Sequence, residues 1–268
     1  AESYWLPPDN YQEVPSGRVA YRTSPTNIGI ALLANLSACD FGFISTGTFL
    51  ERTEKSLAVM EKLERYKGHF FNWYDTVTLN PLPPRYVSSV DSGNLAGHLL
   101  VLRAGIAEFA GKSVISPLVF KGIQISLDVL IETSSSLPGD ATAAALVKIR
   151  PDLEAAIQSP PTSPIQAQKT LEYLKTVTEA VTTQNVPISS SPENSPGGQL
   201  YEFFARQIQD ALDELTCFMP WTNLSGWENT VLRDFPELDT PLALFEIAAL
   251  EDNILPRLAQ RIATVSYT

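Results

Sequence analysis

The chain has 268 residues, of which 44% are hydrophobic and 18% are charged, so it carries enough apolar surface for a packed core. Its 30 acidic residues against 19 basic ones give a net charge of -11. Such a charge repels a phosphate backbone, which argues against nucleic acid as a partner. No run approaches the ~20 apolar residues that cross a bilayer, so we expect no direct membrane contact from this segment.

The cysteines and histidines indicate neither a metal site nor a cofactor. Cys39 and Cys217 lie in apolar helical contexts without CxxC spacing, so we expect buried free thiols in a reducing compartment, with a single disulfide as the alternative. His69 and His98 have no partner at ligand spacing. We therefore expect them to be hydrogen-bonded structural histidines.

The first third of the chain predicts helices separated by loops. Residues 1–23 are rich in proline and polar groups, which is typical of an ordered loop. A serine and proline at 24–25 then begin a nearly all-apolar helix that stops at Gly42. Ser45 can cap a second, amphipathic helix that ends at Gly68. Such pairing of an apolar with an amphipathic helix is what a ring of helical hairpins requires.

A long aromatic loop occupies residues 69–90, and a third apolar helix follows with Asp91 or Ser92 as its cap. The later part of the chain is rich in Ala, Ser, Thr, Gln and Pro, with soft linkers at 159–164 and 188–198. Its helices are expected near 117–133, 140–158, 165–184, 198–219 and 240–264.

Strand signals are nearly absent, so the sequence predicts an all-α protein. The change in amino-acid composition along the sequence divides the chain into a first helical part at 1–112, a helical insertion at 113–198 and resumed helices at 199–268.

Two loops combine aromatic with acidic and amide side chains, as carbohydrate clefts do. Sugar rings pack their C–H faces on aromatic rings, and their hydroxyls need fixed donors and acceptors. Trp5, Trp73 and Tyr74 are the candidate ring platforms. The candidate hydroxyl partners are Asp9, Asn10, Gln12, Glu13, Arg22, Asp75, Asp91 and Asn94.

Structural roles for the same residues are the alternatives. Trp5 and Trp73 can be core anchors that hold their loops in place. Asp91 can serve only as a helix cap, and Arg22 can form an ion pair with Asp75 that ties the two loops together. No catalytic residue and no metal ligand is predicted.

The order of the residues in these loops carries more information than their composition. The segments WLPPDNYQE, RTSPTNIGIALLANLSACDFGFIS and LERYKGHFFNWYDTVTLNPLPPRYVSSVDSGNLAGHLL together resemble the glycoamylase-like middle region of bacterial cyclic β-1,2-glucan synthases, nearly continuously from residue 4 to 102. The resemblance implies a partial (α/α)6 toroid within the domain that closes a β-1,2-glucan by transglycosylation. It also implies a parent membrane enzyme whose remaining domains are partners, with this segment on the cytoplasmic side of the bacterial inner membrane.

The resemblance further implies that the two glutamates of the retaining reaction lie beyond the point corresponding to Thr268. Such a reaction needs two carboxyl groups about 5 Å apart, and the matched loops identify no such pair. The expected function is therefore carbohydrate binding without catalysis of its own. One alternative is a small glycoside hydrolase that uses Glu13 or Asp75 with Asp91. The other is a structural helical scaffold, whose loop aromatics would be fully buried.

Overall fold

The computed structural model describes residues 4–135, 146–185, 196–223 and 232–265. Within them helices dominate, as the sequence predicts. The chain forms two compact units: unit 1 comprises residues 1–40 with 46–108, and unit 2 comprises residues 41–45 with 109–268. The division of the chain into three segments, which its composition predicts, remains a prediction. The toroid also remains a prediction.

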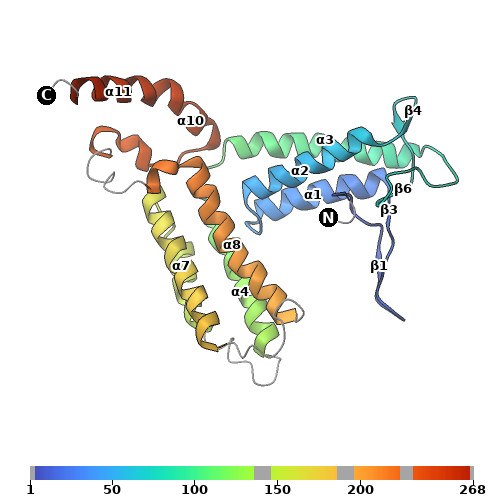
Figure 1. The fold of residues 1–268 in the computed structure, drawn as a ribbon, viewed down its shortest axis with the longest axis horizontal. Helices are drawn as coiled ribbons and strands as arrows, with labels where there is room; N and C mark the ends of the chain where they lie inside the picture. Colours follow the sequence, from blue (N-terminus) through green and yellow to red (C-terminus); the bar gives the residue numbers. More distant parts are fainter. Residues whose placement is uncertain (1–3, 136–145, 186–195, 224–231, 266–268) are drawn as a thin grey trace. The chain divides into compact units, whose positions relative to one another are not determined.

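Unit 1 contains three helices that lie side by side (Figure 1). They are α1 (Pro25–Asp40), α2 (Thr46–Lys62) and α3 (Ser89–Ala110). The helix α1 begins as expected, since the Ser24 hydroxyl accepts the backbone N–H of Asn27 at 3.2 Å. On α2 the buried side chains, among them Phe49 and Met60, recur at helical spacing on one face.

The helices α1 and α3 run in the same direction and pack closely. A Cβ added to Gly29 of α1 would lie 2.3 Å from His98 Nδ1 of α3, and one added to Gly105 of α3 would lie 2.6 Å from Leu36 of α1. Glycine at both places allows this approach. The buried His98 Nδ1 has no hydrogen-bond partner, so the expectation of a hydrogen-bonded His98 is wrong for this nitrogen.

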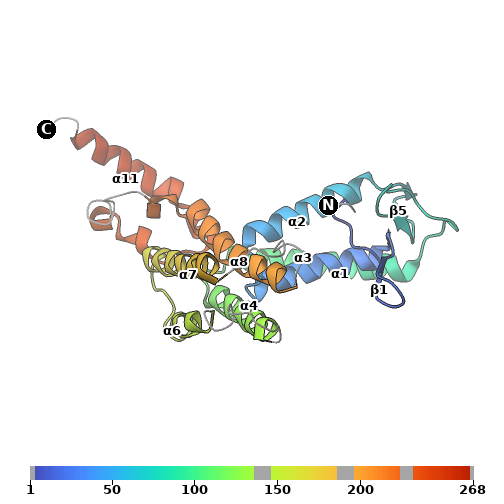
Figure 2. The ribbon, with the colours of Figure 1, turned by 60° about the horizontal axis from the view of Figure 1, so that its bottom comes forward.

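Short strand pairs join the loops of unit 1, although the sequence shows almost no strand signal. The antiparallel pairs are β1 (Tyr11–Gln12) with β2 (Arg18–Val19), β3 (Arg22–Thr23) with β6 (Tyr74–Asp75), and β4 (Arg65–Tyr66) with β5 (His69–Phe70). These loops, apart from the outer part of the β1–β2 hairpin, gather where α1 and α3 begin (Figure 2). The pair β3–β6 brings the two aromatic loops together.

Two expected helix limits are corrected. The helix α2 ends at Lys62 rather than at Gly68, because residues 65–70 form the β4–β5 hairpin and Gly68, at φ +87°, lies in its turn. The helix α3 begins at Ser89, and the hydroxyl of Ser88 accepts the N–H of Asp91 at 3.1 Å. Asp91 therefore lies inside the first turn and is not the cap.

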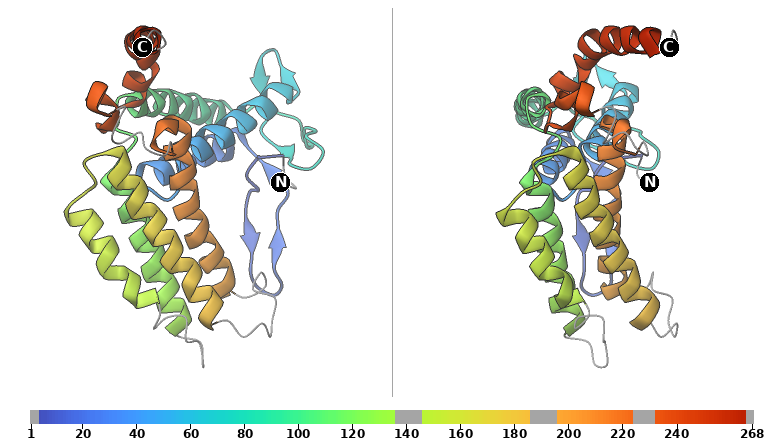
Figure 3. Two further views of the ribbon diagram at one scale, coloured as in Figure 1. Left: turned by 60° about the vertical axis from the view of Figure 1, so that its left-hand side comes forward. Right: turned by 90° about the vertical axis from the view of Figure 1, so that its left-hand side faces the viewer.

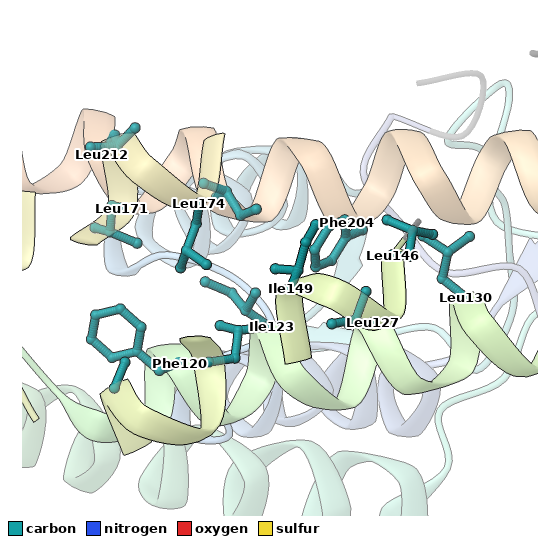
Figure 4. Close-up of a cluster of buried hydrophobic side chains, with 13 residues drawn as sticks. Phe120, Ile123, Leu127, Leu130, Leu146, Ile149, Leu171, Leu174, Phe204 and Leu212 are labelled. Carbon is teal, nitrogen blue, oxygen red and sulfur yellow. The ribbon is translucent and has the colours of Figure 1, made fainter. Parts of the chain in front are cut away.

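Unit 2 is built on four helices that run side by side (Figure 3). They are α4 (Pro117–Ser135), α6 (Arg150–Gln158), α7 (Pro164–Asn185) and α8 (Pro196–Phe218), with the short helix η1 (Val147–Ile149) before α6. Their inner faces form one apolar core that includes Leu127, Leu174 and Phe204 (Figure 4). This core gives unit 2 its own hydrophobic centre.

The last part of unit 2 packs in smaller apolar clusters. It comprises η3 (Pro220–Asn223), η4 (Pro236–Asp239), α10 (Leu244–Ala248) and α11 (Leu250–Val265). The Trp221 indole donates to the Leu238 carbonyl at 3.0 Å, and Met219 is fully buried beside it. The expected linker at 188–198 and the start of the expected helix at 140–158 lie partly outside the described residues.

Gly42 follows the end of α1, belongs to unit 2 and has a left-handed φ of +75°. A Cβ there would lie 2.1 Å from the Leu118 carbonyl oxygen, so only glycine fits this approach to α4. The Gly42 carbonyl accepts the buried Gln207 side chain at 3.0 Å. Cys39 and Cys217 form no disulfide, but Cys217 is exposed, which corrects the expectation of two buried thiols.

Candidate functional site

Asp9 is held by three side chains at the start of α1. Its Oδ2 accepts Nε and Nη2 of Arg22 at 3.0 and 2.9 Å and Nδ2 of Asn10 at 3.2 Å. Its Oδ1 accepts Nδ2 of Asn27 at 3.0 Å. Arg22 thus pairs with Asp9, and no ion pair with Asp75 is found among the described residues. The Asp9 carboxylate therefore fixes the guanidinium on the outer surface of the first loop.

Asp91 joins three separate segments at the start of α3. Its Oδ1 accepts the Thr26 hydroxyl of α1 at 2.7 Å, and Thr26 in turn accepts Nδ2 of Asn94 at 3.1 Å. Its Oδ2 accepts Nδ2 of Asn72 at 2.8 Å. This carboxylate therefore links α1, α3 and the aromatic loop, in place of the capping role considered from the sequence.

Asn72 is buried, and both ends of its side-chain amide have hydrogen-bond partners. In the amide orientation that satisfies both of its ends, Oδ1 accepts the Tyr86 hydroxyl at 2.8 Å and the Trp73 indole N–H at 2.9 Å. The Arg22 guanidinium lies 4.6 Å from the centre of the Trp73 ring. One face of Trp73 is therefore occupied by a cation, and its indole nitrogen is fixed.

These contacts link neighbouring side chains, with Thr26 and Asn27 joined only through the backbone, and we call the set the polar cluster. Its members in order are Asp9, Arg22, Trp73, Asn72, Asp91, Thr26 and Asn27, with Asn10, Asn94 and Tyr86 attached. Because each member is held by at least one other, the cluster has a defined geometry before any ligand arrives, which reduces the entropy lost on binding.

Six of the eleven predicted site residues come together in the polar cluster, namely Asp9, Asn10, Arg22, Trp73, Asp91 and Asn94. The others lie in different surroundings. Gln12 donates to the Val14 carbonyl at 2.8 Å in the β1–β2 hairpin, and Glu13 is exposed in the same hairpin. Trp5 is 41% exposed, but Lys55 Nζ lies 4.5 Å from its ring centre.

Tyr74 is a buried anchor with no exposed ring face. Its side chain is 0% exposed, its hydroxyl donates to the Glu64 carbonyl at 2.7 Å, and it accepts the Phe71 N–H at 2.8 Å. Burial raises the pKa of the Tyr74 phenol above its usual value. The structure therefore gives Tyr74 the anchoring role that the sequence left open for the neighbouring tryptophan.

Asp75 shapes the turn that follows β6. Its Oδ1 accepts the backbone N–H groups of Val77 and Thr78 at 2.8 and 2.7 Å. Hydrogen bonds from these amides, that of Thr78 foremost, lower the pKa of the Asp75 carboxyl. The carboxylate is an Asx-turn acceptor, which ties it to its own loop.

Sequence reasoning missed Thr26, Asn27, Asn72 and Tyr86 as members of the site. Thr26 and Asn27 lie in the first turn of a helix whose sequence is mostly apolar. The composition of that helix therefore did not indicate a polar site. Asn72 and Tyr86 lie inside the aromatic loop, where a search for amides next to aromatic residues could have found them.

Among the described residues, no group of three or more His, Cys, Asp or Glu side chains is placed to hold a metal ion. No described helix is long and apolar enough to cross a membrane.

The sequence is homologous to part of a known synthase. Over 110 residues, 41% of this chain, it is 52% identical to the cyclic beta-(1,2)-glucan synthase NdvB of Rhizobium meliloti (strain 1021). The match covers 4% of that protein, so the chain spans only a small fraction of the relative's length. No protein-family model matches the chain.

Proposed function

We propose that unit 1 binds β-1,2-glucan or a related oligosaccharide, as the carbohydrate-binding portion of the glucan-cyclising domain of a cyclic β-1,2-glucan synthase. The observation that carries this proposal is the polar cluster, a preorganised set of amide, carboxylate and guanidinium groups with the exposed ring of Tyr86 attached. The identity of 52% over 110 residues to a synthase of this kind supports it.

A toroid of helical hairpins would explain the composition of the helices. The helix α3 carries apolar residues around its circumference, yet only Leu95 and Leu102 are buried. A helix that is hydrophobic all round is typical of the centre of a larger helical assembly. We propose that α1 to α3 are part of an (α/α)6 toroid completed by other parts of a parent enzyme.

Exposed loop aromatics favour the binding role over a structural scaffold. A scaffold predicts that the loop aromatics are fully buried, as Tyr74 is. Trp5 and Tyr86 of the same loops are 41% and 45% exposed. Large aromatic rings that fixed partners hold at the surface are available to contact a ligand, whereas they contribute little to packing of the core.

The binding role is tested by titrating the whole chain with linear β-1,2-glucan by calorimetry. A site open on one side buries few ligand contacts, so we expect a dissociation constant of about 1 mM, near 4 kcal/mol. Asn94→Ala should weaken binding about two- to tenfold, the effect of losing one exposed hydrogen-bond partner.

Asn80→Ala is the matched control, because Asn80 is an exposed asparagine of the same unit outside the polar cluster. It should leave the dissociation constant unchanged. Absence of saturable binding by the folded wild-type chain, or equal losses in both variants, would contradict the proposal.

A further inference from the structure

Tyr86 is an exposed ring whose position is fixed at both ends. The side chain is 45% exposed. Its hydroxyl is 2.8 Å from the Asn72 side-chain amide, and its backbone carbonyl accepts the Asn72 N–H at 2.9 Å. A single buried residue therefore holds both the backbone and the tip of Tyr86, so the ring is presented to solvent without the freedom of an ordinary surface tyrosine.

The ring of Tyr86 also differs in its surroundings from the rings of the aromatic residues expected from the sequence. Arg22 lies over Trp73, Lys55 lies over Trp5, and Tyr74 is 0% exposed. Among the described residues, no aromatic or cationic side chain stacks on Tyr86. Of the two aromatic members of the polar cluster, Tyr86 is the more exposed, whereas Trp73 is half-buried with Arg22 over one face.

A line of fixed polar groups begins at the Tyr86 hydroxyl. The Asn72 Oδ1 accepts this hydroxyl, and the Asn72 Nδ2 donates to the Asp91 carboxylate. The Asp91 carboxylate also accepts the Thr26 hydroxyl, which itself accepts Nδ2 of Asn94. Each link is a hydrogen bond of 2.7 to 3.1 Å. A flat apolar ring next to such a line matches a pyranose, which has C–H groups on its faces and hydroxyls around its rim.

We infer that Tyr86 is the platform on which a pyranose ring of the ligand packs, and that Asn72 is the positioning residue that holds it. This inference rests on the proposed function and assigns the contact within that site to a residue other than Trp73, Tyr74 or Trp5. The ligand is a saccharide with mainly equatorial hydroxyls, as in a β-linked glucan, so that one face of the ring is free to stack.

The inference is tested by titrating wild-type chain, Tyr86→Ala and Tyr86→Phe with a linear β-1,2-glucan oligosaccharide. Losing the stacked ring should weaken binding about tenfold in Tyr86→Ala. Tyr86→Phe keeps the ring and should stay within about threefold of wild type. Tyr66→Ala is the matched control, because Tyr66 is a 54% exposed tyrosine of the β4–β5 hairpin without an asparagine partner, and it should bind as wild type does.

A second measurement needs no variant and so does not depend on folding of Tyr86→Ala. Isotope-filtered NOEs in the wild-type complex should connect the Tyr86 ring protons to sugar C–H protons. Wild-type affinity in Tyr86→Ala, or NOEs that run to other aromatic rings only, would overturn the inference and leave the proposed function standing. No saturable binding by the wild-type chain would overturn the proposed function, and this inference with it.

Discussion

Replacing Tyr74 with alanine is expected to lower the free energy of unfolding of unit 1 by about 3–5 kcal/mol, the range for truncating a large buried aromatic residue. The ring is fully buried, and it meets the rings of Phe70 and Phe71 edge-on with centroids 6.5 Å apart. Its hydroxyl ties the Glu64 carbonyl to the Phe71 amide. Alanine removes all of these contacts.

Urea unfolding followed by tryptophan fluorescence measures the Tyr74 effect, because Trp73 is adjacent. Tyr74→Phe should cost about 1–3 kcal/mol, since it leaves the buried Phe71 amide unpaired. Tyr66→Ala, an exposed tyrosine of the same unit, should cost under about 0.5 kcal/mol. A loss below about 1 kcal/mol for Tyr74→Ala would show that Tyr74 does not anchor the loop.

Phe204→Ala should destabilise unit 2 by about 3–5 kcal/mol, because Phe204 is 0% exposed in the four-helix core. The neighbouring Phe203 on α8 is 42% exposed, so Phe203→Ala is a matched control that should cost under about 1 kcal/mol. Thermal unfolding followed by far-UV circular dichroism compares the two. Equal losses in the two variants would contradict the core assigned to unit 2.

The helices were largely predictable because their signals are local. The Ser24-Pro25 cap and the apolar run after it fix the start of α1, and the helices expected near 117–133 and 165–184 correspond to α4 and α7. The residues at which the helices end were less predictable. The end of α2 depends on the pairing of β4 with β5, and a pair of two-residue strands is too short to leave a pattern of alternation in the sequence.

The site was only half predictable because three consecutive residues of the second loop do not share one environment. In extended chain successive side chains point to opposite sides, so Trp73, Tyr74 and Asp75 cannot all face one ligand. Tyr74 points into the core, whereas Trp73 joins the polar cluster. The composition of such a loop indicates a functional role, but it does not show which of its side chains points into the core.

The contacts of Asp91 were also beyond the sequence. Its partners Thr26 and Asn72 are 65 and 19 positions away, and they meet because α1 and α3 pack closely through Gly29 and Gly105. Only the helix packing brings these groups together. A reading of local spacing therefore found a cap where the structure has a link between three segments.

Binding of β-1,2-glucan by the polar cluster of unit 1 can be measured by mapping amide shift changes in the isotope-labelled chain on adding linear β-1,2-glucan. We expect the shifts to concentrate at residues 9–27, 72–76 and 86–94, around the Asp9–Arg22 and Asn72–Asp91 contacts, with α4, α6, α7 and α8 unchanged. Shifts centred on unit 2, or none in unit 1 at glucan concentrations well above about 1 mM, would contradict this expectation.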